Sequence, residues 1–102
     1  MKLSLVATAL LALTTTGAFA QNIYDRKVDQ QERIAQGVRS GELTAGETRN
    51  LETREASINR QEFRMRRADG GYLTGRDRAI LTCRQNNVSR SIYRDKHNGW
   101  VR

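Results

Sequence analysis

The stretch SGELTAGE at residues 40–47 decides the fold, and it recurs thirty residues later as GGYLTGRD at residues 70–77. Each copy is a glycine-containing turn followed by Leu-Thr and, three residues after the threonine, by an acid. In the first copy, Thr44 and Glu47 have the spacing of a capping box, in which the threonine hydroxyl and the acid satisfy free backbone N–H groups. Glycine at the turns provides the positive φ that a helix exit often needs. Each stretch therefore predicts a turn and the start of a helix.

The likeness continues beyond these stretches. Residues 41–64 match residues 71–94 at ten positions without a gap, which predicts a duplicated turn-helix unit. The second copy carries Thr74 and Asp77, a weaker form of the capping box.

Apolar residues at spacings of three, four and seven predict helices, and no alternating strand pattern competes. We expect helices at about residues 25–39, 45–67 and 75–96, with Asn98-Gly99 as a stop. Short turns make successive helices antiparallel. The predicted fold class is all-α: short-turn helical hairpins or a three-helix bundle, with EF-hand-like helix-loop-helix units that lack intact calcium loops.

Each predicted helix has one thin core face. The expected face residues are, in order of the helices, Val28, Gln31, Ile34, Ala35 and Val38; Leu51, Glu55, Ile58, Glu62 and Met65; and Leu81, Gln85, Val88 and Ile92. An unpaired buried carboxylate is costly. We therefore expect Glu55 and Glu62 at the rim of their face; pairing with an arginine such as Arg84, or burial under a partner, are the alternatives.

The first 20 residues have the pattern of an export signal. Lys2 precedes a short apolar run, and Ala18-Phe19-Ala20 gives a small-residue cleavage site. The run is about half of the roughly 20 apolar residues that a membrane span needs. We expect a cleaved signal peptide at residues 1–20, one helical domain at residues 21–102, and a periplasmic or secreted location.

Positive charge is concentrated in the second half of the chain. Residues 60–102 contain eleven basic and four acidic residues, and nearly all of the basic ones are arginine. Arginine binds phosphate and carboxylate bidentately. The candidate anion-binding face comprises Arg49, Arg60, Arg64, Arg67, Arg76, Arg90 and Arg94, with His97 on the same side. A solvated face that keeps the protein soluble is the alternative interpretation. Phe63 and Tyr93 are expected at the core edge.

The turns have an EF-hand-like spacing, with a glycine and a later acid at the places of loop positions 6 and 12. Positions 1, 3 and 5, which should carry oxygen ligands, would be Gln36, Val38 and Ser40 in the first unit. In the second unit they would be Arg66, Ala68 and Gly70. One carboxylate per loop is too few for calcium, so we expect no metal site and no cofactor.

Cys83 is the only cysteine, so it cannot form a disulfide within the chain. We expect either a free exposed thiol or an intermolecular disulfide. Cys83 and His97 lie 14 residues apart on one predicted helix, about 21 Å at the helical rise. With no nucleophile-base set, phosphate loop or ligand cluster recognisable, we expect no enzymatic activity.

Several runs together resemble a family of small exported proteobacterial helical proteins with SGxLTxxE and GGxLTxxD repeats. The runs are residues 30–38, residues 40–44 with Glu47, residues 70–74 and residues 89–98. The resemblance implies export and a helical fold, and it carries no functional residues across. Cys83 departs from the family's pattern.

These observations predict a non-catalytic structural or protein-interaction module whose partner is an unknown protein or a second copy of the chain. The first alternative is a polyanion-binding protein, with nucleic acid, lipid headgroups or lipopolysaccharide as ligand. The second alternative is a weak divalent-cation binder at the turns.

Overall fold

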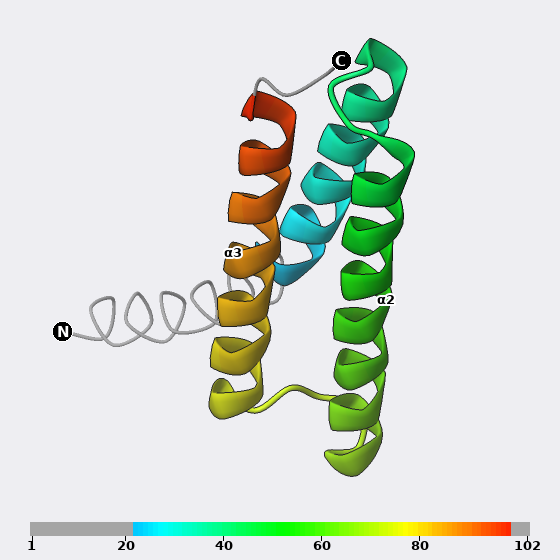
Figure 1. Cartoon of the computed structure of the whole chain (residues 1–102). Helices are drawn as coiled ribbons and strands as arrows, with labels where there is room; N and C mark the ends of the chain where they lie inside the picture. The colour runs from blue at the N-terminus through cyan, green and yellow to red at the C-terminus, as the bar shows by residue number, and fades with distance from the viewer. Residues whose placement is uncertain (1–21, 99–102) are drawn as a thin grey trace, which may run out of the picture.

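The computed structural model describes residues 22–98, and these residues form three helices and no strand. The first helix covers residues 22–40 of the described part, followed by α2 at Ala45–Ala68 and α3 at Gly75–His97. In Figure 1, α2 and α3 run antiparallel, and the first helix, in blue to cyan, lies behind them. The predicted all-α three-helix bundle is confirmed. The predicted signal peptide lies outside the described residues.

Both capping boxes are complete, and they explain why α2 and α3 begin where they do. The Thr44 hydroxyl accepts from the Glu47 N–H at 3.1 Å, while the Thr44 N–H donates to Glu47 Oε1 at 2.9 Å. Thr74 and Asp77 make the same two bonds at 3.0 and 3.1 Å. Asp77, although its side chain is shorter, thus makes the same two capping-box hydrogen bonds as Glu47.

The turn between the first helix and α2 folds a leucine back onto the helix that precedes it. Gly41 has a φ of 79°, and the Leu43 N–H donates to the Gly37 carbonyl at 3.0 Å. Leu43 is buried directly against Gly37: a Cβ atom added at Gly37 would lie 2.6 Å from the leucine side chain. Gly37 therefore leaves the space that Leu43 occupies.

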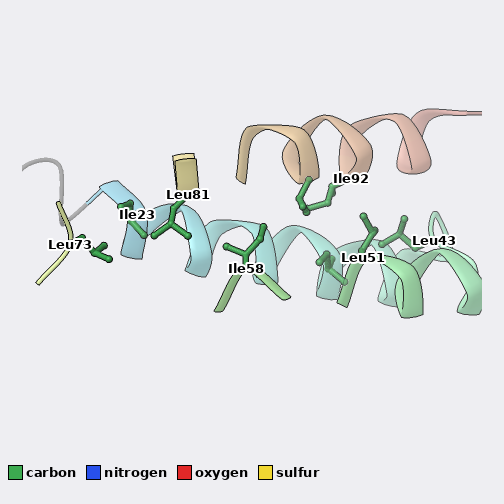
Figure 2. Close-up of a cluster of buried hydrophobic side chains, with 9 residues drawn as sticks. Ile23, Leu43, Leu51, Ile58, Leu73, Leu81 and Ile92 are labelled. Atoms are coloured by element: carbon green, nitrogen blue, oxygen red, sulfur yellow. The ribbon is translucent and has the colours of Figure 1, made fainter. Parts of the chain in front are cut away.

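The core is a single row of aliphatic side chains. In Figure 2, the labelled core side chains lie in a row along the molecule, from Leu73 near one end to Leu43 near the other. Its members are Ile23, Ile34, Leu43, Leu51, Ile58, Leu73, Leu81, Val88 and Ile92, with Met65 packed against them. Each helix contributes only a few apolar residues, so the two turn leucines extend the core toward its ends.

The predicted core face of the first helix is wrong in most of its members. Val28 and Val38 are 39% and 50% exposed, and Gln31 and Ala35 are also exposed; only Ile34 is buried. The observed face also contains Ile23, Gln30 and Gly37. Gln30 can be buried because its amide nitrogen donates to the Gln85 carbonyl at 2.7 Å. The buried face of the first helix thus contains Gln30, bonded to the backbone of α3, and not the expected Val28 and Val38.

The rim placement predicted for Glu55 is also wrong, because that residue is only 5% exposed. Glu62 is nearly buried and bonds to Lys27 of the first helix at 2.9 Å and to Arg66 at 3.0 Å. Arg84, the partner considered from the sequence, instead donates to Gln61 and Ser57. An ion pair across two helices thus holds one of the two acids inside the bundle.

Replacement of Gly37 by alanine should destabilise the fold, although alanine favours a helix more than glycine does. The added methyl group must displace Leu43, and overpacking of this kind costs about 1–3 kcal/mol. Gly46→Ala is the matched control, because nothing lies within 4 Å of its Cβ position. Urea unfolding should show a lower midpoint for Gly37→Ala and an unchanged or higher one for Gly46→Ala. Equal midpoints for the two variants would contradict the packing.

The two inward acids of α2 should give opposite pH dependence. Burial, with a further effect of the Glu52 charge, raises the pKa of Glu55 above its ordinary 4.5. Burial alone would also raise the pKa of Glu62, but hydrogen bonds from Lys27 and Arg66 lower it below 4.5.

The folded state therefore holds a proton on Glu55 more readily than the unfolded chain, and its ionisation destabilises the fold as the pH rises from 4.5 to 7. Glu62 contributes stability above pH 4.5 and loses it as the pH falls further. Glu55→Gln should raise the melting temperature at pH 7 and change it less at pH 4.5. Glu62→Gln should lower it at pH 7. Equal effects of Glu55→Gln at both pH values would refute the assignment.

Candidate polyanion-binding clusters

Two groups of exposed cations and aromatic rings occupy the C-terminal halves of α2 and α3. The spacing of three, four and seven residues places the members of each group on one helix face. Cluster 1 consists of Arg60, Phe63, Arg64 and Arg67, and cluster 2 consists of Arg90, Tyr93, Arg94 and His97. The members correspond one to one at the thirty-residue offset found in the sequence.

Cluster 1 surrounds an exposed phenylalanine. Phe63 is 62% exposed, and the guanidinium of Arg67 lies 5.8 Å from the centre of its ring. Asn59 joins Arg60, Phe63 and Arg64 around a shallow hollow of about 330 Å³. This arrangement presents an aromatic face to solvent with positive charge on several sides.

Cluster 2 surrounds an exposed tyrosine in the same way. Tyr93 is 61% exposed and stacks on the His97 ring, with the ring centres 4.0 Å apart and the planes at 21°. The Arg94 Nε atom lies 3.5 Å from a carboxylate oxygen of Asp95, and Arg90 donates to Asn87. The chemistry of cluster 1 is therefore repeated here, with a histidine in place of the third arginine.

The structure divides the predicted anion-binding face into two regions. All seven arginines are exposed, but α2 and α3 are antiparallel, so their C-terminal halves lie toward opposite ends of the bundle. Arg76, in the first turn of α3, shares an end with cluster 1. Arg49, in the second turn of α2, shares the other end with cluster 2. A long ligand would therefore have to extend along the bundle to contact both.

Sequence reasoning did not identify the two aromatic rings as candidate binding groups. Phe63 and Tyr93 were expected at the core edge, and both are exposed instead. The available signal was their position three residues after one arginine and directly before another in both units. Apolar character alone suggested burial and obscured that pattern.

The turn before α3 brings two carboxylates together. A hydrogen bond shared with Asp77 raises the pKa of Asp69, whereas the backbone N–H of Thr74 is the main cause of the lowered pKa of Asp77. Two carboxylates supply few of the six to eight oxygens that calcium takes. Within residues 22–98, no three side chains of histidine, cysteine, aspartate or glutamate gather in one place.

Cys83 is exposed on α3. It lines a groove of about 650 Å³ together with Ala79, Thr82 and Asn86, and Arg78 and Arg90 also border the groove. The free thiol and the intermolecular disulfide, the two alternatives for Cys83, both stay predictions.

None of the helices in the described part of the chain has the length and apolar character needed to cross a membrane. No family model, curated protein or solved structure matches the chain.

Proposed function

We propose that this chain is an exported, non-catalytic interaction module that binds an acidic polymer through clusters 1 and 2. The observation that carries the proposal is the exposure of Phe63 and Tyr93, each among cations, at matching positions of two helices. An aromatic ring loses favourable burial when it stands in water. Its exposure in both units is explained if a ligand covers it.

The combination of groups favours a polymer that carries both negative charge and flat rings. Arginine contacts phosphate oxygens, while exposed aromatic side chains stack on bases, as in proteins that bind single-stranded nucleic acid. A ligand recognised by charge alone would need no ring at the centre of each cluster. Single-stranded nucleic acid is therefore the probe that best matches the chemistry, and heparin is the charge-only comparison.

Periplasmic or secreted location is part of the proposal and is supported by the signal-peptide pattern of residues 1–20. The expectation of a non-catalytic role is supported by the helical separation of Cys83 and His97. Both lie on α3, at positions well apart along its axis. Binding of a polymer requires a stable surface of cations and rings and no catalytic group, and two packed helices can provide such a surface.

Removal of the cluster arginines should weaken binding and reduce its dependence on salt. Each contact to a single-stranded phosphate contributes about 0.7 to the slope of log affinity against log salt. Arg60→Gln/Arg64→Gln and Arg90→Gln/Arg94→Gln should each lower that slope for an oligothymidylate by about 1.4. Fluorescence anisotropy at several salt concentrations provides the measurement.

Arg26→Gln/Arg39→Gln is the charge-matched control, because both of its residues lie on the first helix outside the clusters. This variant should keep most of the affinity. If the control lost as much affinity and slope as the cluster variants, net charge alone would explain the binding. The proposed surfaces would then be rejected.

Removal of the rings should separate stacking from charge. Stacking of a base on an aromatic side chain is worth about 1–3 kcal/mol. Phe63→Ala and Tyr93→Ala should therefore weaken oligothymidylate binding by roughly fivefold or more each. Retention on heparin should be nearly unchanged, since heparin has no bases. Parallel loss on both ligands would show that the rings support the arginines rather than contact the polymer.

A further inference from the structure

A small cavity lies between α2 and α3, and its lining residue Asn87 accepts a hydrogen bond from Arg90 of cluster 2. Two half-buried arginines, Arg54 on α2 and Arg84 on α3, line one small cavity of about 130 Å³. Ile58 and Val88 line it as well, and Asn87 adds a side-chain amide. The two arginines and the two aliphatic residues are pairs that match at the thirty-residue offset.

The hydrogen bonds around the cavity follow the same correspondence. Arg54 donates to the Ser91 hydroxyl of α3 at 2.8 Å, and Arg84 donates to the side-chain oxygen of Gln61 on α2. Gln61 and Ser91 also match at an offset of thirty. Each helix therefore offers an arginine to the other helix and accepts one from it. The antiparallel packing of α2 and α3 relates these two bonds by a local two-fold axis.

The partners of these arginines hold them in place without neutralising them. Arg54 bonds to a serine, and Arg84 bonds to Gln61 and to the Ser57 hydroxyl at 3.0 Å, all of which are uncharged. Neither arginine forms an ion pair with an acid in the described part of the chain. The nearby Glu55 carboxylate is not among the residues that line the cavity.

Both arginines that line the cavity keep N–H donors that these bonds do not use. A guanidinium has five N–H donors in a planar fork. The side-chain bonds described above use one donor of Arg54 and two of Arg84. Guanidinium groups at both sides of one cavity repel each other unless negative charge lies between them. An anion with several oxygens would satisfy the free donors and relieve that repulsion.

We infer that this cavity binds a tetrahedral oxyanion, of which phosphate is the type, between Arg54 and Arg84. The volume equals about four times the roughly 30 Å³ that one water occupies in the liquid, so the space suits one such group. Arginine forks match phosphate oxygens bidentately. Charge favours a dianion over a single carboxylate, since two guanidinium groups face the site. Free phosphate and a phosphate group of a bound polymer share this chemistry.

The primary experiment measures thermal stability of the protein in sodium phosphate and in sodium chloride at equal ionic strength. Phosphate at about ten times its Kd should raise the melting temperature by about 5 °C or more over chloride. Arg54→Gln/Arg84→Gln should lose that gain. Arg60→Gln/Arg64→Gln, which alters cluster 1 only, should keep it. Equal stabilisation by chloride, or an undiminished gain in Arg54→Gln/Arg84→Gln, would overturn the site.

A second measurement on the unaltered protein covers the case in which the double variant does not fold. Titration of phosphate into ¹⁵N-labelled protein should shift the backbone amide signals of Ile58 and Val88 along one saturable curve. The amide signals of Phe63 and Tyr93 should shift less. Larger shifts at the exposed clusters than at the cavity would contradict the assignment.

Two further measurements distinguish a phosphate group of a bound polymer from a free oxyanion as the occupant of the cavity. If a polymer phosphate fills the cavity, Arg54→Gln/Arg84→Gln should weaken oligothymidylate binding, and free phosphate should compete with the oligonucleotide. If the occupant is a free oxyanion, oligonucleotide binding should be unaffected by that variant while the phosphate-dependent gain in melting temperature is still lost. The cavity site does not depend on the proposed function, because failure of clusters 1 and 2 to bind a polymer leaves the phosphate titration interpretable.

Discussion

The antiparallel contact between α2 and α3 is the constraint on which the rest of the structure depends. Each helix offers one narrow aliphatic ridge, Leu51 with Ile58 on α2 and Leu81 with Val88 on α3. Because the two units pack antiparallel, a contact of one helix recurs with the matching residues exchanged: Arg54 of α2 bonds to Ser91 of α3, and Arg84 of α3 bonds to Gln61 of α2. The ridges, the cross-helix arginines and the exposed clusters all follow from that one contact. The first helix covers the remaining side of the pair.

Narrow ridges leave polar side chains inside the bundle, and their hydrogen bonds define how the helices align. Gln30 donates to the backbone of α3, and Gln85 donates to the Ile23 carbonyl of the first helix at 3.1 Å. These bonds can form in only one register, whereas aliphatic contacts tolerate small slips. One buried oxygen each of Gln30, Glu55 and Gln85, the Oε1 atom in all three, has no hydrogen-bond partner within the described residues. Unpaired buried oxygens lower stability, so the bundle combines a thin core with strict alignment.

Local sequence signals predicted α2 and α3 well because their ends are set by residues close in sequence. Thr44 and Thr74 cap the helices through neighbours three residues away, and the glycines of the turns adopt the expected positive φ. The core face of the first helix depends on contacts with residues far along the chain, so periodicity could not identify it. The site was predictable in part: the exposed arginines were identified from the sequence, but the exposure of Phe63 and the cavity between Arg54 and Arg84 depend on tertiary packing.

Three of the four acids in residues 60–102 act in the fold, and the fourth, Asp95, lies 3.5 Å from Arg94 of cluster 2. Asp77 caps α3, Asp69 shares a hydrogen bond with it, and the nearly buried Glu62 forms ion pairs with Lys27 and Arg66. These carboxylates are engaged in structure, so they offer little charge to the arginines of cluster 1. A fold that used its acids to pair surface arginines would lose its caps and its inner ion pair. The use of these acids in caps and in the Glu62 ion pairs thus leaves the guanidinium groups of cluster 1 available to an anionic ligand from outside.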